Sequence, residues 1–281
     1  MCPTRRNWPR GLILSVVYAL AIAGVVASGG GGGNGASVSF PNPTLPDGAV
    51  TLNIGNAQDI AESAVEFARI ISTIAQFKTA APPTIPAVIK QVTDRIIERS
   101  RSSQPVVTGV TENLSSEFCT GGGGGTAIAN YNESASSASG RITFTTCDIG
   151  FGILISGTVS FDTSWNDTTL AYDNRFGGTL SFVFGADTFT FVFDLSDTGN
   201  EGTGAFSSTI KFSLDGIPGG GFLVTTTQRW EGDFSGFTSG QFIVQGANNT
   251  RLRITVVPGN MADVELDEGS GFTYVNTIPL A

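Results

Sequence analysis

The chain has 281 residues, of which 14% are charged, and its 24 acidic and 15 basic side chains give a formal net charge of −9. Such an acidic protein lacks the lysine and arginine clusters that bind nucleic acids or anionic membrane surfaces, so we expect no nucleic-acid partner. The chain also contains no histidine. This excludes the Ser-His-Asp triad, the Cys-His dyad and zinc sites that use histidine.

Residues 1–27 have the order of a secretory signal peptide. Arg5, Arg6 and Arg10 precede an uncharged apolar run at 11–26, and small residues follow that run. We expect cleavage after Ala27 and export to the periplasm, the cell surface or the medium. The alternative is an uncleaved membrane anchor, for which the apolar run is short, because a spanning helix needs about 20 residues.

Two cysteines remain in the exported chain, because Cys2 leaves with the signal peptide. Cys119 and Cys147 form an even pair in a compartment that oxidises thiols, so we predict a disulfide between them. The alternative is a pair of free, buried thiols.

Residues 28–55 are rich in glycine and proline and predict a tether that reaches the folded domain. Residues 56–101 then predict a two-helix hairpin. The first helix, at 57–79, places its apolar residues at helical spacing: Ile60, Ala64, Phe67, Ile71, Ile74 and Phe77. The second helix begins near Pro86, and its apolar residues are Ile85, Val88, Ile89, Val92 and Ile96.

From 102 to 281 the apolar period changes to two, which is typical of antiparallel strands with one buried face. The clearest runs carry their apolar residues at Ile142 and Phe144, Leu180 to Phe184, Phe189 to Leu195, Ile210 to Leu214, Phe242 and Val244, and Leu252 to Val256. Short turns rich in glycine and asparagine separate the runs. We therefore expect a mainly β fold, a large curved antiparallel meander (half-barrel or closed barrel), with the helical hairpin packed against it in one folded unit.

Phenylalanine is unusually frequent, at 20 residues. Six occupy alternate positions of neighbouring runs and are candidates for an apolar face: Phe182, Phe184, Phe189, Phe191, Phe193 and Phe212. A curved sheet with such a concave face needs a cover, which the amphipathic helices could supply. This architecture is similar to that of bacterial lipoprotein carriers and related periplasmic lipid binders, in which a half-barrel holds acyl chains under a helical lid. The resemblance implies a lipid or another apolar ligand.

The glycine run at 29–33, the segment GRITFTTCDIGFGILISGTVSF around Cys147 and the C-terminal segment GQFIVQGANNTRLRITV carry a second resemblance. They are similar to uncharacterised exported proteobacterial lipoproteins with β-hairpin patterns, whose mature chain opens with cysteine and a glycine run. Ser28 stands where those proteins have the lipidated cysteine. Without that thiol no diacylglycerol attaches, so we expect the protein to be released or held by other means.

Two segments suggest ligand chemistry that their spacing does not support. The run Gly121–Gly125 lacks the lysine and hydroxyl residue that a phosphate-binding loop needs, and we interpret it as a hairpin loop inside the disulfide. Asp263, Glu265 and Asp267 are weak candidates for calcium ligands. Their alternation predicts the solvated face of a strand instead, and we expect no metal and no cofactor.

Several carboxylates could form the pair that glycoside hydrolysis requires: Asp162, Asp167, Asp173, Asp187, Asp194 and Asp197. Trp165, Tyr172 and Trp230 could stack on sugars, although such residues more often pack in cores. We expect no catalytic residue and a non-enzymatic protein that binds an apolar ligand or a surface partner. Two alternatives remain open: an outer-membrane β-barrel, suggested by runs such as TLSFVFGADTFTFVFDL, and a hydrolase built on an aspartate pair.

Overall fold

The computed structural model describes residues 38–72, 106–113, 119, 121–132, 136–148, 153–166, 168–217, 219–233 and 235–280. The predicted signal peptide, the glycine run of the tether and the predicted second helix lie outside these ranges. Within them, no helix has the length and apolar character needed to cross a membrane.

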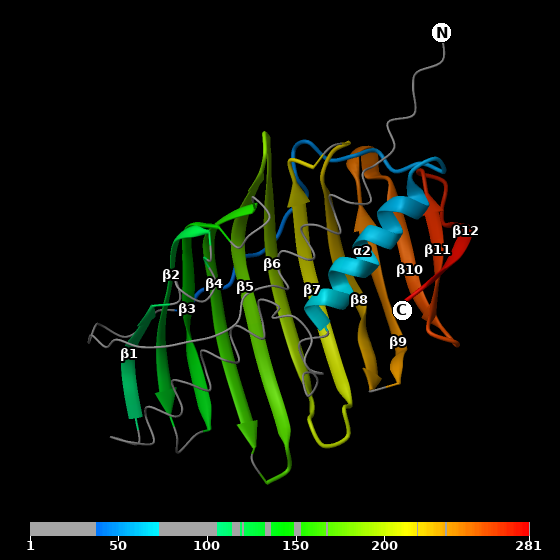
Figure 1. The fold of residues 1–281 in the computed structure, drawn as a ribbon. Coiled ribbons are helices and arrows are strands. Elements are labelled where there is room, and N and C mark those ends of the chain that lie inside the picture. Colours follow the sequence, from blue (N-terminus) through cyan, green and yellow to red (C-terminus); the bar gives the residue numbers. More distant parts are fainter. Residues whose placement is uncertain are drawn as a thin grey trace.

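Twelve strands form one antiparallel sheet in which each strand pairs with its neighbours in the sequence (Figure 1). The sheet is curved, and β1 and β12 form its two edges, so the described sheet is open; of the two forms expected from the sequence, the open one is found. The strands are β1 Val106–Asn113, β2 Gly122–Asn132, β3 Ser137–Asp148, β4 Ile153–Asn166, β5 Ala171–Phe184, β6 Asp187–Asn200, β7 Phe206–Asp215, β8 Phe222–Asp233, β9 Gly236–Gln245, β10 Arg251–Val257, β11 Met261–Asp267 and β12 Thr273–Pro279.

Along each strand, alternate side chains point to opposite faces of the sheet, and one face is more buried than the other, as the sequence period predicted. In β6 the side chains of Phe189, Phe191 and Phe193 are buried, and the residues between them are half-buried. We call the face that carries these rings the inner face, and the opposite one the outer face. Cross-strand pairing continues the inner face through Phe193, Phe212, Val224, Val244, Leu252 and Leu266.

Helix α2 (Ala57–Ser72) lies across the inner face and packs mainly against β10, β11 and β12 (Figure 1). Ile60, Ala61 and Ala64 are fully buried in the same apolar cluster as the inner face. The first predicted helix is thus confirmed over 57–72, and its expected end at 73–79 lies outside the described residues. The predicted two-helix hairpin is not supported, because the described part of the chain contains one α-helix.

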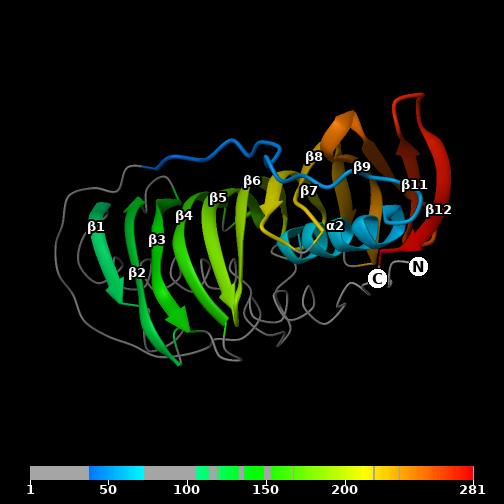
Figure 2. The same ribbon diagram turned by 90° about the horizontal axis from the view of Figure 1, so that it is seen from above.

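The segment 38–50 is extended and follows the outer face, on the side of the sheet opposite α2 (Figure 2). The guanidinium of Arg175 lies 4.3 Å from the centroid of the Phe40 ring, and Lys211 Nζ donates a 2.6 Å hydrogen bond to Asn42 Oδ1. A Cβ at Gly177 would come within 3.1 Å of Phe40, so this glycine allows the close approach. The second half of the predicted tether is therefore held against the sheet.

The predicted disulfide between Cys119 and Cys147 is present and anchors residue 119 to β3. It closes a loop with a sequence separation of 28. A cross-link of this length removes conformational freedom chiefly from the unfolded chain.

We predict that replacing both cysteines, Cys119→Ala with Cys147→Ala, lowers the free energy of unfolding by about 3 kcal/mol, as the chain-entropy model gives for such a loop. Urea unfolding of the oxidised wild type and the double variant measures the difference. Reductant should destabilise the wild type and leave the double variant unchanged. A difference below about 1 kcal/mol would mean that the bond does not constrain the unfolded state.

Candidate functional site: the inner face and its polar row

Aromatic rings cover the inner face from β5 to β9. Phe182 stacks on Phe189 with ring centroids 5.0 Å apart, and the Phe191 and Phe212 centroids are 5.6 Å apart. Farther along the sheet Trp230 stacks on Phe242 at 4.9 Å. These groups of rings lie on the same face, and we call them together the aromatic surface. Offset and edge-to-face pairs stabilise at such distances.

Five of the six predicted apolar-face residues have side chains buried on the inner face, with exposed fractions of 4% or less: Phe182, Phe189, Phe191, Phe193 and Phe212. The sixth, Phe184, ends β5, where it pairs with Asp187. Helix α2 packs mainly at the other end of the sheet, against β10 to β12. The phenylalanine-rich part of the inner face therefore lies away from the main contacts of this helix.

A row of polar residues crosses this aromatic surface. Register places them directly opposite one another on successive strands from β4 to β8: Thr163, Asn174, Asp197, Ser208 and Trp230. Tyr172 lies two residues before Asn174 on the same face of β5, and we call these six residues the polar row. Ser208 Oγ donates a 2.5 Å hydrogen bond to Asp197 Oδ1, and Thr163 Oγ1 donates to Asn174 Oδ1.

Three buried polar atoms of the row have no hydrogen-bond partner in the described structure: Tyr172 Oη, Asp197 Oδ2 and Trp230 Nε1. Asp197 is fully buried. A buried donor or acceptor without a partner costs about 1–3 kcal/mol, and folded proteins contain few of them. Three such atoms in one row therefore indicate that a bound water or ligand supplies their hydrogen-bond partners.

Glycines make room for the two large side chains of the row. Tyr172 pairs with Gly199, where an added Cβ would lie 2.4 Å from Tyr172 Oη. Gly240 has a φ of +142°, and a Cβ there would approach Trp230 Cδ1 to 2.8 Å. Both positions therefore require glycine if the phenol and the indole are to keep their places.

Burial determines the ionisation of the row. Desolvation raises the pKa of Asp197 to about 7. Interactions of its carboxylate with the hydroxyls of Ser208 and Tyr172 oppose this effect, and the charge of Asp173 reinforces it. Burial likewise raises the pKa of Tyr172 well above its usual value, and the nearby carboxylates of Asp197 and Glu201 raise it further. The phenol thus lies near the Asp197 carboxylate and interacts with it, although the geometry of the pair falls short of a hydrogen bond.

The structure separates the carboxylates that the hydrolase alternative requires. Asp197 faces inward, whereas Asp162, Asp173 and Asp194 alternate onto the outer face. Asp194 there accepts two hydrogen bonds from Arg175, of 3.0 and 2.9 Å. Asp187 is exposed at the start of β6, and Asp167 lies outside the described residues. Among the carboxylates that the structure describes on β4 to β6, Asp187 and Asp197 have inward parity. Asp187 is exposed at the opposite end of β6, about 30 Å along the strand, whereas glycoside hydrolysis needs two carboxylates about 5–10 Å apart.

The aromatic residues considered for sugar stacking are not an exposed platform. Trp165 pairs directly with Tyr172 across β4 and β5 and packs against the core, while Trp230 lies three strands from Tyr172 and is buried. Tyr172 and Trp230 belong instead to the polar row.

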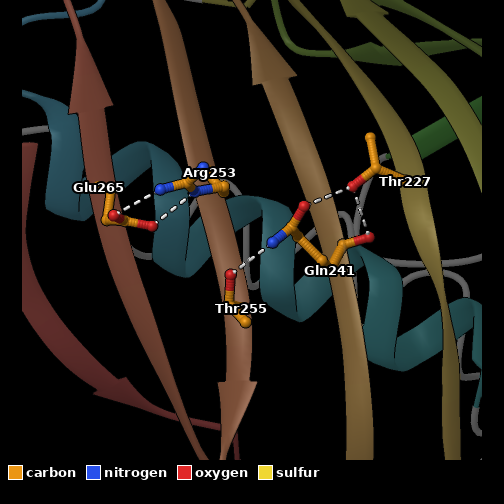
Figure 3. Close-up of polar contacts among 5 residues, drawn as sticks. All are labelled: Thr227, Gln241, Arg253, Thr255 and Glu265. Carbon is orange, nitrogen blue, oxygen red and sulfur yellow. Dashed lines mark hydrogen bonds and ion pairs between the residues drawn. The ribbon is translucent and has the colours of Figure 1, made fainter. Parts of the chain in front are cut away.

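The weak calcium candidates lie along β11, and each is occupied by a protein donor. Asp263 accepts a 2.6 Å hydrogen bond from Thr277 Oγ1, and Glu265 accepts two from Arg253, of 2.6 and 2.7 Å (Figure 3). Asp267 binds Arg251 and accepts from the backbone of Gly269 and Gly271, which holds its pKa at about 2. Across the described ranges no group of three or more histidine, cysteine or acidic residues is placed to hold a metal ion.

Two more polar contacts lie beside the Arg253–Glu265 pair, on the same face of the sheet, and join β8, β9 and β10. Gln241 Nε2 donates to Thr255 Oγ1 at 3.0 Å, and Thr227 Oγ1 lies 2.9 Å from Gln241 Oε1 (Figure 3). Figure 3 also shows α2 behind the strands, so these residues belong to the outer face. Here polar groups satisfy one another, in contrast to the inner row.

The run Gly121–Gly125 is not the loop that its composition suggested. Residues from Gly122 onward form the start of β2 and pair with β3, and Gly121 N donates a 3.0 Å hydrogen bond to Asp148 O. Backbone pairing to β3 therefore outweighs the poor strand propensity of glycine at this place.

The polar row was missed as a unit, although one sequence signal marks it. In β6 the inward positions read Phe189, Phe191, Phe193, Leu195 and Asp197, so a carboxylate occupies a position that the alternation reserves for an apolar side chain.

Comparisons with protein-family models, curated proteins and solved structures found no match to this chain.

Proposed function

We propose that this chain is an exported, non-enzymatic binding protein that holds an apolar molecule on the inner face of its sheet, over β4 to β8. The observation that carries the proposal is the set of three unpartnered polar atoms inside an aromatic surface. Sites for small apolar molecules combine an apolar lining with a few polar groups that fix orientation, which is the composition of this face.

The aromatic lining would supply most of the binding free energy. Burying apolar surface contributes about 25 cal/mol per Å², so a ligand chain lying along the phenylalanine rings could bind without any charged contact. The rings are already buried in the free protein, so the ligand must replace existing contacts. We therefore expect slow exchange of the bound molecule.

Export is supported by the disulfide between Cys119 and Cys147, since such bonds persist in oxidising compartments. The apolar run at 11–26, with arginines before it, is consistent with the same location. A carrier of apolar molecules would be useful there, because such molecules cannot cross an aqueous space alone.

Fluorescence titration with the uncharged dye N-phenyl-1-naphthylamine tests the proposal. We predict a saturable rise in fluorescence on adding the wild-type protein. Phe191→Leu should weaken dye binding about 3- to 10-fold, because it removes a ring that contacts Phe193 and Phe212 and aromatic pairs are worth about 0.5–1.5 kcal/mol.

Ile254→Val is the matched control, since it trims an inner-face residue on β10, a strand against which α2 packs. It should bind the dye as the wild type does. Circular dichroism and urea unfolding of both variants confirm that each remains folded. The proposal fails if the dye does not saturate, or if the two substitutions weaken binding equally.

A further inference from the structure

The unpartnered atoms of the polar row have a definite hydrogen-bonding character. Trp230 Nε1 can only donate, Tyr172 Oη can donate or accept, and Asp197 Oδ2 accepts when the carboxyl group is ionised. A group that satisfies all three must accept at least one hydrogen bond and donate another. A hydroxyl group does both, having one donor hydrogen and two lone pairs.

These atoms belong to one patch of the sheet. Asp197, Ser208 and Trp230 lie directly opposite one another on β6, β7 and β8. Tyr172 Oη lies against Gly199, the next inward position of β6 after Asp197. A single small head group placed on β6 and β7 would therefore lie near the phenol and the carboxylate, with the indole one strand farther.

The charge around the patch excludes an anionic head group. The charged groups that raise the pKa values of Asp197 and Tyr172 are acids, Asp173 and Glu201. The basic residues of the same strands point to the outer face, where Arg175 binds Asp194 and Lys211 donates to Asn42. Among the described residues of these strands, a carboxylate or phosphate would thus meet like charges and no inward-facing cation.

We infer that the polar row binds the uncharged hydroxyl head of an apolar ligand, as in fatty alcohols and monoacylglycerols. This inference rests on the proposed function, because the alkyl chain of such a ligand would lie on the phenylalanine-rich part of the inner face. The head group accepts from Trp230 Nε1 and Tyr172 Oη and donates to Asp197 Oδ2. An ordered water making the same bonds is the competing occupant.

Isothermal titration calorimetry of the full-length protein at pH 8 compares decan-1-ol with decanoate, which share an alkyl chain. We expect decan-1-ol to bind at least about tenfold more tightly, since like charges in a partly desolvated site repel by more than the equivalent of tenfold in affinity. The substitution Asp197→Asn should strengthen decanoate binding and so reduce the difference.

Two conservative substitutions test the individual donors. Tyr172→Phe and Trp230→Phe should each weaken decan-1-ol binding about 3- to 10-fold, the value of one hydrogen bond, and weaken binding of N-phenyl-1-naphthylamine less, since that dye has no hydroxyl head. Tyr274→Phe removes an exposed hydroxyl that contacts Thr277 and serves as the control. It should change neither affinity.

The outcomes separate this inference from the proposed function. If the dye saturates the inner face but decan-1-ol and decanoate bind equally, or Tyr172→Phe and Trp230→Phe leave decan-1-ol binding unchanged, then water completes the row and the head-group assignment is wrong. If neither dye nor decan-1-ol binds, the apolar site itself is wrong.

Discussion

Asp197→Asn is expected to stabilise the protein at pH 8 by about 2–4 kcal/mol, an unusual result for a buried residue. Burial raises the pKa of Asp197 to about 7, roughly three units above that of an exposed aspartate, and each unit corresponds to about 1.4 kcal/mol. At pH 8 the folded wild type must hold an ionised carboxylate among aromatic rings. The neutral amide removes this cost and can still accept from Ser208 Oγ.

The pH dependence of the free energy of unfolding is a second way to measure the cost of ionising Asp197 in the folded state. Between about pH 4 and pH 7 the folded state retains the proton of Asp197 that the unfolded chain has lost, so the stabilising contribution is complete below pH 4 and disappears as the pH rises through 7. Wild-type stability should therefore decline across this window, and that of Asp197→Asn should decline less. Urea unfolding at pH 5, 6.5 and 8 measures both.

Asp187→Asn is the control for this experiment, because Asp187 is exposed at the start of the same strand. It should follow the wild-type curve at every pH. An Asp197→Asn variant that is less stable than the wild type at pH 8 would show that the ionised carboxylate has partners, and the polar row would no longer be an incomplete site.

Phe212→Ala is expected to lower the free energy of unfolding by about 3–5 kcal/mol, as large-to-small substitutions in closely packed cores do. The Phe212 side chain is fully buried, and its ring lies 5.6 Å from Phe191 and 6.2 Å from Phe222, centroid to centroid. Removing it leaves a cavity at the centre of the aromatic surface. Urea unfolding against the wild type gives the value.

Tyr274→Ala provides the comparison on the opposite face. Tyr274 is 59% exposed at the edge strand β12, and we expect its removal to change stability by less than about 0.5 kcal/mol. If Phe212→Ala cost no more than Tyr274→Ala, the inner-face rings would not be packed as the structure has them.

The strands and the disulfide could be predicted from the sequence because both depend on local or simple signals. Alternation of apolar residues, as in Phe189 to Leu195, identifies a strand and its buried face without knowledge of its neighbours. Cys119 and Cys147 were the one pair expected to remain after removal of the signal peptide. The candidate phenylalanines followed from the same alternation.

Other features depend on contacts between distant parts of the chain. The period of two is the same in an open and in a closed sheet, so alternation could not determine whether the edges meet. The segment 38–50 has the composition of a linker, and its attachment depends on Arg175 and Lys211, far away in the sequence. Gly122 to Gly125 form a strand only because β3 supplies pairing partners.

The polar row shows the same limit at the candidate site. Asp197, Tyr172 and Trp230 were each noticed in the sequence, but as separate carboxylate and aromatic candidates. Their alignment requires the register of successive strand pairs, which a single sequence does not determine. The alternation from Phe189 to Leu195 does predict that Asp197 points inward, and a charged residue at a buried position of a strand indicates a site.

Native mass spectrometry of the protein, purified without detergent from the envelope fraction of its producing cells, tests the central claim most directly. We expect wild-type protein to carry a lipid-sized adduct that denaturation releases, and Tyr172→Phe and Asp197→Asn to carry less of it than the Tyr274→Phe control. A bare chain in all four proteins, with the disulfide intact, would contradict the claim that the inner face holds an apolar ligand.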